Sequence, residues 1–183
     1  PLHCSAGAAG FDDLLSLDDV DHIVASSGLR LPAFRLVKDG ATLPQSSYTK
    51  STRTGSMAAT GVADPPAIFR EFAGGATIVL QALHVNWLPL AVFCRQLEDA
   101  LGLGVQANSY YTPRGSQGFA VHHDTHDVFV LQCAGTKHWV VREPAVDTPL
   151  PHQVSDHEAA AARPVRFEAD LRAGDVLYLP RGV

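Results

Sequence analysis

The spacing of apolar residues changes character about halfway along the chain. In the first half, apolar positions recur at helical intervals over residues 88–101, and helix start and stop signals predict two short helical pieces within 11–28 and a helix at 64–72. Two apolar runs rich in β-branched residues lie between them and predict short strands at 34–37 and 77–83. The first half is therefore expected to mix helices with isolated strands.

From residue 105 onward the pattern has period two, and turn residues separate short segments. Strands are predicted at 105–112, 127–133, 136–142 and 175–179. Helices first and consecutive strands afterwards favour an antiparallel β-structure decorated with helices, a sandwich or a barrel, over alternating βαβ units.

Two stretches show neither the helical spacing nor the period-two alternation of apolar residues. Residues 41–63 are rich in Ser, Thr, Gly and Ala and are expected to form a long loop. Residues 149–164 are rich in Pro and Ala and are expected to form a surface excursion.

Composition and charge narrow the class of protein. With 46% hydrophobic and 18% charged residues over 183 positions, the chain is globular and long enough for one domain with its own core. A net charge of -5 argues against direct nucleic-acid binding, which usually shows a basic footprint. No apolar run approaches the roughly 20 residues of a membrane span. Three cysteines without CxxC spacing argue against a zinc ribbon or disulfide framework, so a cytoplasmic location is expected.

The first candidate for chemistry is a histidine-rich segment at 121–127. Residues two apart in an extended segment share a face, so His122 and Asp124 are expected to point the same way. Imidazole plus carboxylate with open positions is the beginning of a facial triad for non-haem iron(II). His123 is expected to point away and to be exposed. An HxD tripeptide alone is common and is weak support for a metal site.

Two neighbouring predicted strands carry further candidates. One places Lys137 on the same face as Trp139 and Val141, where a buried charge needs an anionic partner unless the side chain reaches water. The other places Asn108 and Tyr110 on one polar face, which is either solvated or the wall of a polar pocket.

These segments together resemble the JmjC-type cupin family of ribosomal oxygenases. The resemblance is carried by the run from Asn108 to Phe119, by His122-His123-Asp124, and by residues 127–132, 135–139 and 174–182. It covers most of the chain more loosely, and the combination is far more specific than HxD alone.

The resemblance implies a mainly β fold with added α-helices. This is a double-stranded β-helix, or jelly roll, with N-terminal helices packed outside. The expected organisation is a single catalytic domain over 1–183, incomplete at its C-terminus. Within it, 1–104 would be helical and strand decoration, and 105–183 the jelly-roll core strands.

The resemblance also implies a site. Fe(II) would be held by His122 and Asp124, and 2-oxoglutarate would be bound at its far carboxylate by Lys137. Asn108 and Tyr110 would help to line the cosubstrate pocket. The family's second metal-binding histidine is expected two residues beyond Val183.

The activity implied is hydroxylation of a His or Arg side chain on a ribosomal protein, with a homodimer possible in the full-length protein. Two alternatives stay open: a non-catalytic cupin-fold binding module, and a metal-dependent cupin enzyme acting on a small molecule. Lys137, Asn108 and Tyr110 together argue against the small-molecule enzyme. A histidine two residues past Val183 would argue against the binding module.

Overall fold

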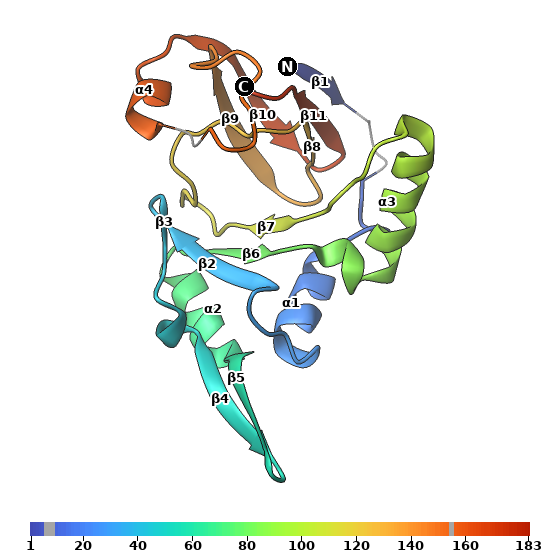
Figure 1. Cartoon of the computed structure of the whole chain (residues 1–183), viewed down its shortest axis with the longest axis vertical. Helices are drawn as coiled ribbons and strands as arrows, with labels where there is room; N and C mark the ends of the chain where they lie inside the picture. The colour runs from blue at the N-terminus through green and yellow to red at the C-terminus, as the bar shows by residue number, and fades with distance from the viewer. Residues whose placement is uncertain (6–9, 154–155) are drawn as a thin grey trace. The chain divides into compact units, whose positions relative to one another are not determined.

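The computed structural model describes residues 1–5, 10–153 and 156–183, which fall into two compact units (Figure 1). One unit comprises residues 17–120, and the other comprises 1–16 together with 121–183. All strand pairs among the described residues are antiparallel. This architecture confirms the predicted class of a mainly β fold with added helices. No helix in the described ranges is long and apolar enough to cross a membrane.

The unit formed by 17–120 is built on a four-stranded sheet. Its strand order is β3 (Ala41–Thr42), β2 (Phe34–Lys38), β6 (Thr77–Leu80) and β7 (Ser109–Tyr111). Alternation along the strands gives this sheet one apolar face, whose members are at most 1% exposed: Phe34, Leu36, Ile78 and Leu80. Such a face supplies the core of this unit.

Three helices accompany this sheet: α1 (Leu17–Ser26), α2 (Pro65–Ala73) and α3 (Leu88–Leu101). Two short 3-10 turns, η1 (Gln45–Ser47) and η2 (Leu83–Val85), lie between the strands and helices. The bounds of α3 agree with the predicted helix at 88–101. It stops at Gly102, whose φ of 67° lies in the left-handed region that glycine adopts without a steric penalty.

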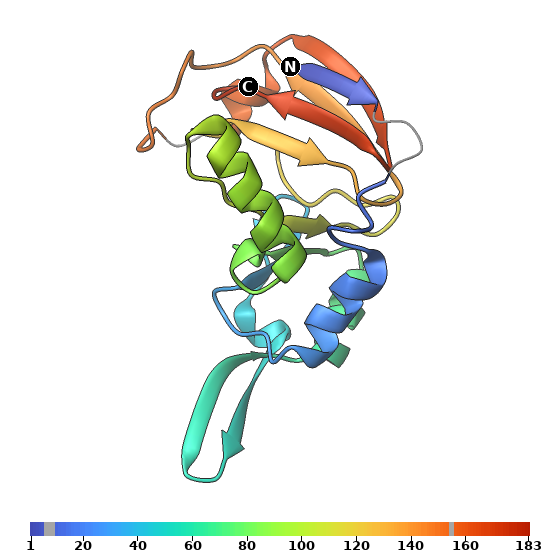
Figure 2. The same cartoon turned by 90° about the vertical axis from the view of Figure 1, so that its right-hand side faces the viewer.

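The expectation of a long loop at 41–63 is wrong. Besides β3 and η1, this stretch forms a hairpin of β4 (Thr49–Thr54) and β5 (Met57–Ala63), which extends away from the rest of its unit (Figure 2). The Ser and Thr content of residues 41–63 is typical of loops, but threonine is β-branched and is also favoured in strands. Gly55, at a φ of 61°, provides the left-handed residue in the turn.

The other unit packs two small antiparallel sheets against each other. One has the order β1 (Leu2–Ser5), β11 (Asp175–Leu179), β8 (Val128–Leu131), and the other pairs β9 (Thr136–Arg142) with β10 (Val165–Arg172). A short helix, α4 (His157–Ala161), lies between β9 and β10 in the chain. The core between the sheets combines Val141 and Leu171 with Leu177 and Leu179.

Sequence patterns located some strands of this unit and missed others. The predictions at 136–142 and 175–179 agree with β9 and β11. The strand predicted at 127–133 is shorter in the structure, where it is β8. In the other unit, the strand predicted at 105–112 is likewise shorter and is β7. Neither β1 nor β10 was predicted. The inward residues of β10, Phe167, Ala169 and Leu171, alternate with charged residues, so the period-two pattern of a strand was present in the sequence and was overlooked.

Candidate active site

The HxD segment precedes β8 and has no regular strand of its own. His122 is exposed and Asp124 is half-buried. His123 is only 9% exposed, so the expectation that it faces solvent is wrong. The reason is that the segment runs beside the core of its unit, where His123 lines a small cavity together with Ala160 and Leu179.

Hydrogen bonds tie this segment to the turn that follows β11. The backbone N–H of Gly182 donates to the carbonyl oxygen of Asp124 at 3.0 Å. The Asp127 carboxylate accepts from the Arg181 backbone N–H at 3.0 Å and from the Tyr178 hydroxyl at 3.2 Å. The Pro-Arg-Gly turn at 180–182 is therefore fixed directly beside the HxD segment.

Lys137 lies on β9 opposite Leu171 of β10, which is fully buried. Its ammonium group is 5.6 Å from the centre of the Trp139 ring, a cation–π distance. Burial lowers the pKa of Lys137 below its ordinary value. No ion pair joins Lys137 to an acidic residue in the part of the chain that the structure describes. A half-buried cation in this position suits an anionic ligand.

Asn108 and Tyr110 belong to the unit 17–120, whereas His122, Asp124 and Lys137 belong to the other unit. The side-chain oxygen of Asn108 accepts from the Ala82 backbone N–H at 2.9 Å. Since that donor fixes which atom is the oxygen, the Asn108 amino group is directed elsewhere. Tyr110 is 48% exposed. Both residues are thus exposed at the surface of their sheet.

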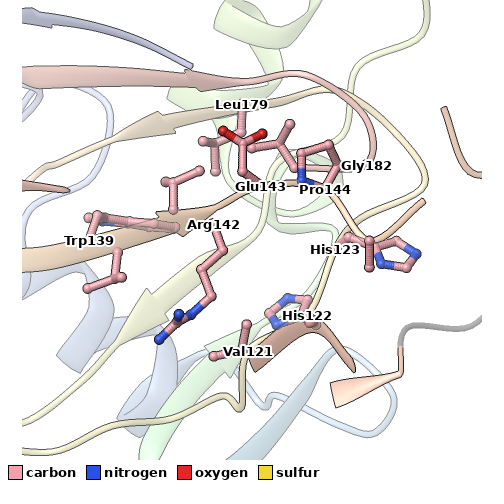
Figure 3. Close-up of a pocket in the computed structure, with 14 residues that line it drawn as sticks. Val121, His122, His123, Trp139, Arg142, Glu143, Pro144, Leu179 and Gly182 are labelled. Atoms are coloured by element: carbon pink, nitrogen blue, oxygen red, sulfur yellow. The ribbon is translucent and has the colours of Figure 1, made fainter. Parts of the chain in front are cut away.

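Figure 3 shows a cavity of about 80 Å³ within the unit that carries the HxD segment. Its lining includes His122 and His123, but not Asp124 or Lys137. Arg142 lines the same cavity, and its guanidinium donates to the carbonyl oxygen of Arg163 at 2.7 Å.

Two nitrogen donors of residues lining this cavity, Arg142 Nε and Trp139 Nε1, are buried without a hydrogen-bond partner in the described residues. Buried donors of this kind usually find an acceptor. Both nitrogen atoms are buried, so a group in the cavity would reach them only after the surrounding side chains move. Sequence reasoning did not single out Arg142, because a lone arginine at the end of a strand reads as a surface residue.

The donors present fit part of an iron site. A neutral imidazole and a carboxylate are two of the three ligands of the 2-His-1-carboxylate arrangement that binds non-haem Fe(II). No group of three or more His, Cys, Asp or Glu side chains in the described ranges is arranged to hold a metal ion. His122 and Asp124 would account for two of the three ligands of such a site, and the described residues offer no third.

Comparison with protein families gives a match to the JmjC domain over residues 83–183. Ribosomal oxygenase 1 of Gallus gallus is 32% identical over 186 residues, covering 100% of this chain and 29% of that protein. The bifunctional lysine-specific demethylase and histidyl-hydroxylase NO66 of Dictyostelium discoideum is 37% identical over 129 residues, covering 67% of this chain and 24% of that protein. The chain thus spans less than a third of the length of these relatives.

Among solved structures, the X-ray structure of E. coli ycfD matches with a TM-score of 0.62 at 21% identity. The match covers 99% of this chain and 44% of that one. It supports the jelly-roll fold expected from the sequence. Because the JmjC match extends over more than half of the chain and includes the HxD segment, the chain belongs to the JmjC-domain family.

Proposed function

We propose that this chain carries the active site of an Fe(II)- and 2-oxoglutarate-dependent oxygenase that hydroxylates a His or Arg side chain of a ribosomal protein. The observation that carries the proposal is Lys137, a half-buried cation without an acidic partner in the described residues, on a core strand that follows the HxD segment. The names of the relatives, a ribosomal oxygenase and a histidyl-hydroxylase, support the same reading.

In this proposal, His122 and Asp124 hold the iron. A histidine that follows Val183 supplies the third ligand. The hydrogen bond from Gly182 to Asp124 supports this, because it holds the turn that precedes that position beside the HxD segment. When bound, the iron with 2-oxoglutarate and O₂ supplies the oxidising power to insert oxygen into a C–H bond.

The protein's own task is then to bind, orient and shield. Lys137 would grip the far carboxylate of 2-oxoglutarate through a charge-assisted hydrogen bond, and the Asn108 amino group and the Tyr110 hydroxyl would donate to the same cosubstrate. Residues 1–183 would serve as parts of one catalytic domain.

The proposed partner is a ribosomal protein. Such proteins are basic, and the net charge of -5 favours their approach at long range. We propose a cytoplasmic location and, for the full-length protein, a homodimer.

Metal binding tests the proposal. We would titrate Mn(II) or Fe(II) anaerobically, with and without 2-oxoglutarate, into this chain and into a version extended past Val183. Tight binding by the extended chain, abolished by His122→Ala or Asp124→Ala, is the expected result. His138→Ala is the matched control, because His138 is exposed and bonded to Asp170 at 2.8 Å.

Succinate release with ribosomal peptides then tests the reaction. Metal binding without 2-oxoglutarate binding would favour the small-molecule cupin enzyme. No metal binding by either chain would overturn the oxygenase proposal and leave the cupin-fold binding module.

A further inference from the structure

A row of side chains crosses three strands of the four-stranded sheet. Arg35 of β2 is paired with Val79 of β6, and Val79 is paired with Tyr110 of β7. Residues paired directly across neighbouring strands point to the same face of a sheet. Arg35 and Tyr110 therefore share a face, opposite to the one that carries Ile78. Their backbones are two strands apart, roughly 10 Å.

Phe119 lies between the ends of this row. The edge of one ring meets the face of the other in the Phe119–Tyr110 pair, with centroids 5.5 Å apart and an interplanar angle of 78°. The guanidinium carbon of Arg35 lies 5.6 Å from the centroid of the same Phe119 ring. Both are favourable aromatic geometries. The Nε of Arg35 is buried and makes no hydrogen bond to another described residue.

The loop that carries Phe119 is itself fixed to the sheet. The carbonyl oxygen of Gly118 accepts from the Gly40 backbone N–H at 2.9 Å. A Cβ at Gly118 would lie 2.6 Å from Thr77 Oγ1, so the loop backbone approaches the sheet more closely than any other residue permits. Thr77 in turn is hydrogen-bonded to Thr112 at 3.0 Å. Phe119 is thus held over the sheet face by its backbone.

We propose that Phe119, supported by Arg35, is a positioning residue that orients Tyr110 for binding 2-oxoglutarate. The inference rests on the function proposed above and deepens it, since it assigns a role to two residues outside the expected ligand set. Tyr110 is 48% exposed, and an exposed tyrosine samples several rotamers. The Phe119 edge contact restricts that freedom before the cosubstrate arrives. Binding then orders fewer side-chain torsions.

The sheet offers a matched control on the opposite face of the same strand. Phe72 of α2 packs on Tyr111, the neighbour of Tyr110, with centroids 4.4 Å apart. Phe72→Leu and Phe119→Leu each remove one aromatic contact from β7. Only Phe119→Leu is predicted to affect the cosubstrate.

The experiment measures 2-oxoglutarate affinity by calorimetry in the presence of Mn(II), using the chain extended past Val183. We expect Phe119→Leu to raise the Kd roughly three- to tenfold, as one aromatic pair contributes, and Arg35→Met to raise it about two- to threefold. Manganese affinity stays unchanged in both. Phe72→Leu lowers the thermal midpoint and leaves the Kd of 2-oxoglutarate as in the wild type.

A second readout requires no metal. The Tyr110 ring resonances of ¹³C-tyrosine-labelled protein should shift in Phe119→Leu, because the Phe119 ring current is lost, and stay in place in Phe72→Leu. The inference is wrong if Phe119→Leu binds 2-oxoglutarate like the wild type, or if Phe72→Leu weakens binding equally. If the wild-type extended chain binds no 2-oxoglutarate, the proposed function fails first and the positioning role falls with it.

Discussion

Replacement of Lys137 by methionine separates stability from function. Methionine keeps an unbranched side chain beside Leu171 and removes the charge. In the described chain that charge faces no acidic partner, only the Trp139 ring at 5.6 Å. A cation in such a place is expected to serve a ligand and not the fold.

The magnitudes follow from the surroundings of the amine. Burial lowers the pKa of Lys137, so the folded state disfavours the charged form and the charge costs stability at every pH below the folded pKa. That cost disappears as the pH rises through the folded pKa towards the unfolded one. Methionine relieves it and forfeits a cation–π contact of about 0.5–1 kcal/mol. The free energy of unfolding at neutral pH should therefore change by no more than about 1 kcal/mol, or rise.

Cosubstrate affinity should respond in the opposite way. A hydrogen bond to a charged group contributes about 1.5–3 kcal/mol, so loss of the Lys137 ammonium should raise the Kd of 2-oxoglutarate roughly 10- to 150-fold. Urea denaturation measures the first quantity, and calorimetry with Mn(II) on the extended chain measures the second. Lys50→Met is the control, because Lys50 lies on the β4–β5 hairpin and pairs with Asp64. A loss of more than about 2 kcal/mol in stability, or an unchanged Kd, would refute the reasoning.

Three further substitutions probe the fold around the site. Asp127→Ala removes both side-chain bonds to the turn after β11 and should cost about 1–2 kcal/mol in urea denaturation, with weaker metal binding; unchanged metal affinity would contradict the role of that turn. Hydrogen bonds to the Asp175 carboxylate, the strongest effect coming from the Arg172 backbone N–H, lower the pKa of Asp175. The stability that Asp175 contributes is therefore present above its ordinary pKa and is lost as the pH falls through the lowered pKa. The free energy of unfolding of Asp175→Asn should accordingly change less between about pH 5 and about pH 2 than that of the wild type. If the two plots of unfolding free energy against pH ran parallel, Asp175 would not contribute in this way. Gly118→Ala places a Cβ 2.6 Å from Thr77 Oγ1 and should destabilise by about 1–3 kcal/mol, whereas a neutral result in thermal unfolding would mean that the loop moves freely.

The sequence by itself determined the elements whose signals are local. The helix at 88–101 and the strands at 136–142 and 175–179 follow from apolar periodicity, and the structure reproduces their bounds. The shared face of Trp139 and Val141 follows from period two, and both pack in the same core. Family membership likewise came from motifs and spacings along the chain.

Only the tertiary structure decided which distant segments meet. The two segments of the hairpin at 49–63 become strands by pairing with each other, and composition does not identify that pairing. His123 is buried because the chain folds back over it, and the Asp124 carbonyl meets Gly182, which lies 58 positions further along the chain. Arg35 and Phe119 meet in the same way. Periodicity records which face of an element is apolar, but the partner that covers that face is set by non-local hydrogen bonding and packing, which one segment of sequence does not encode.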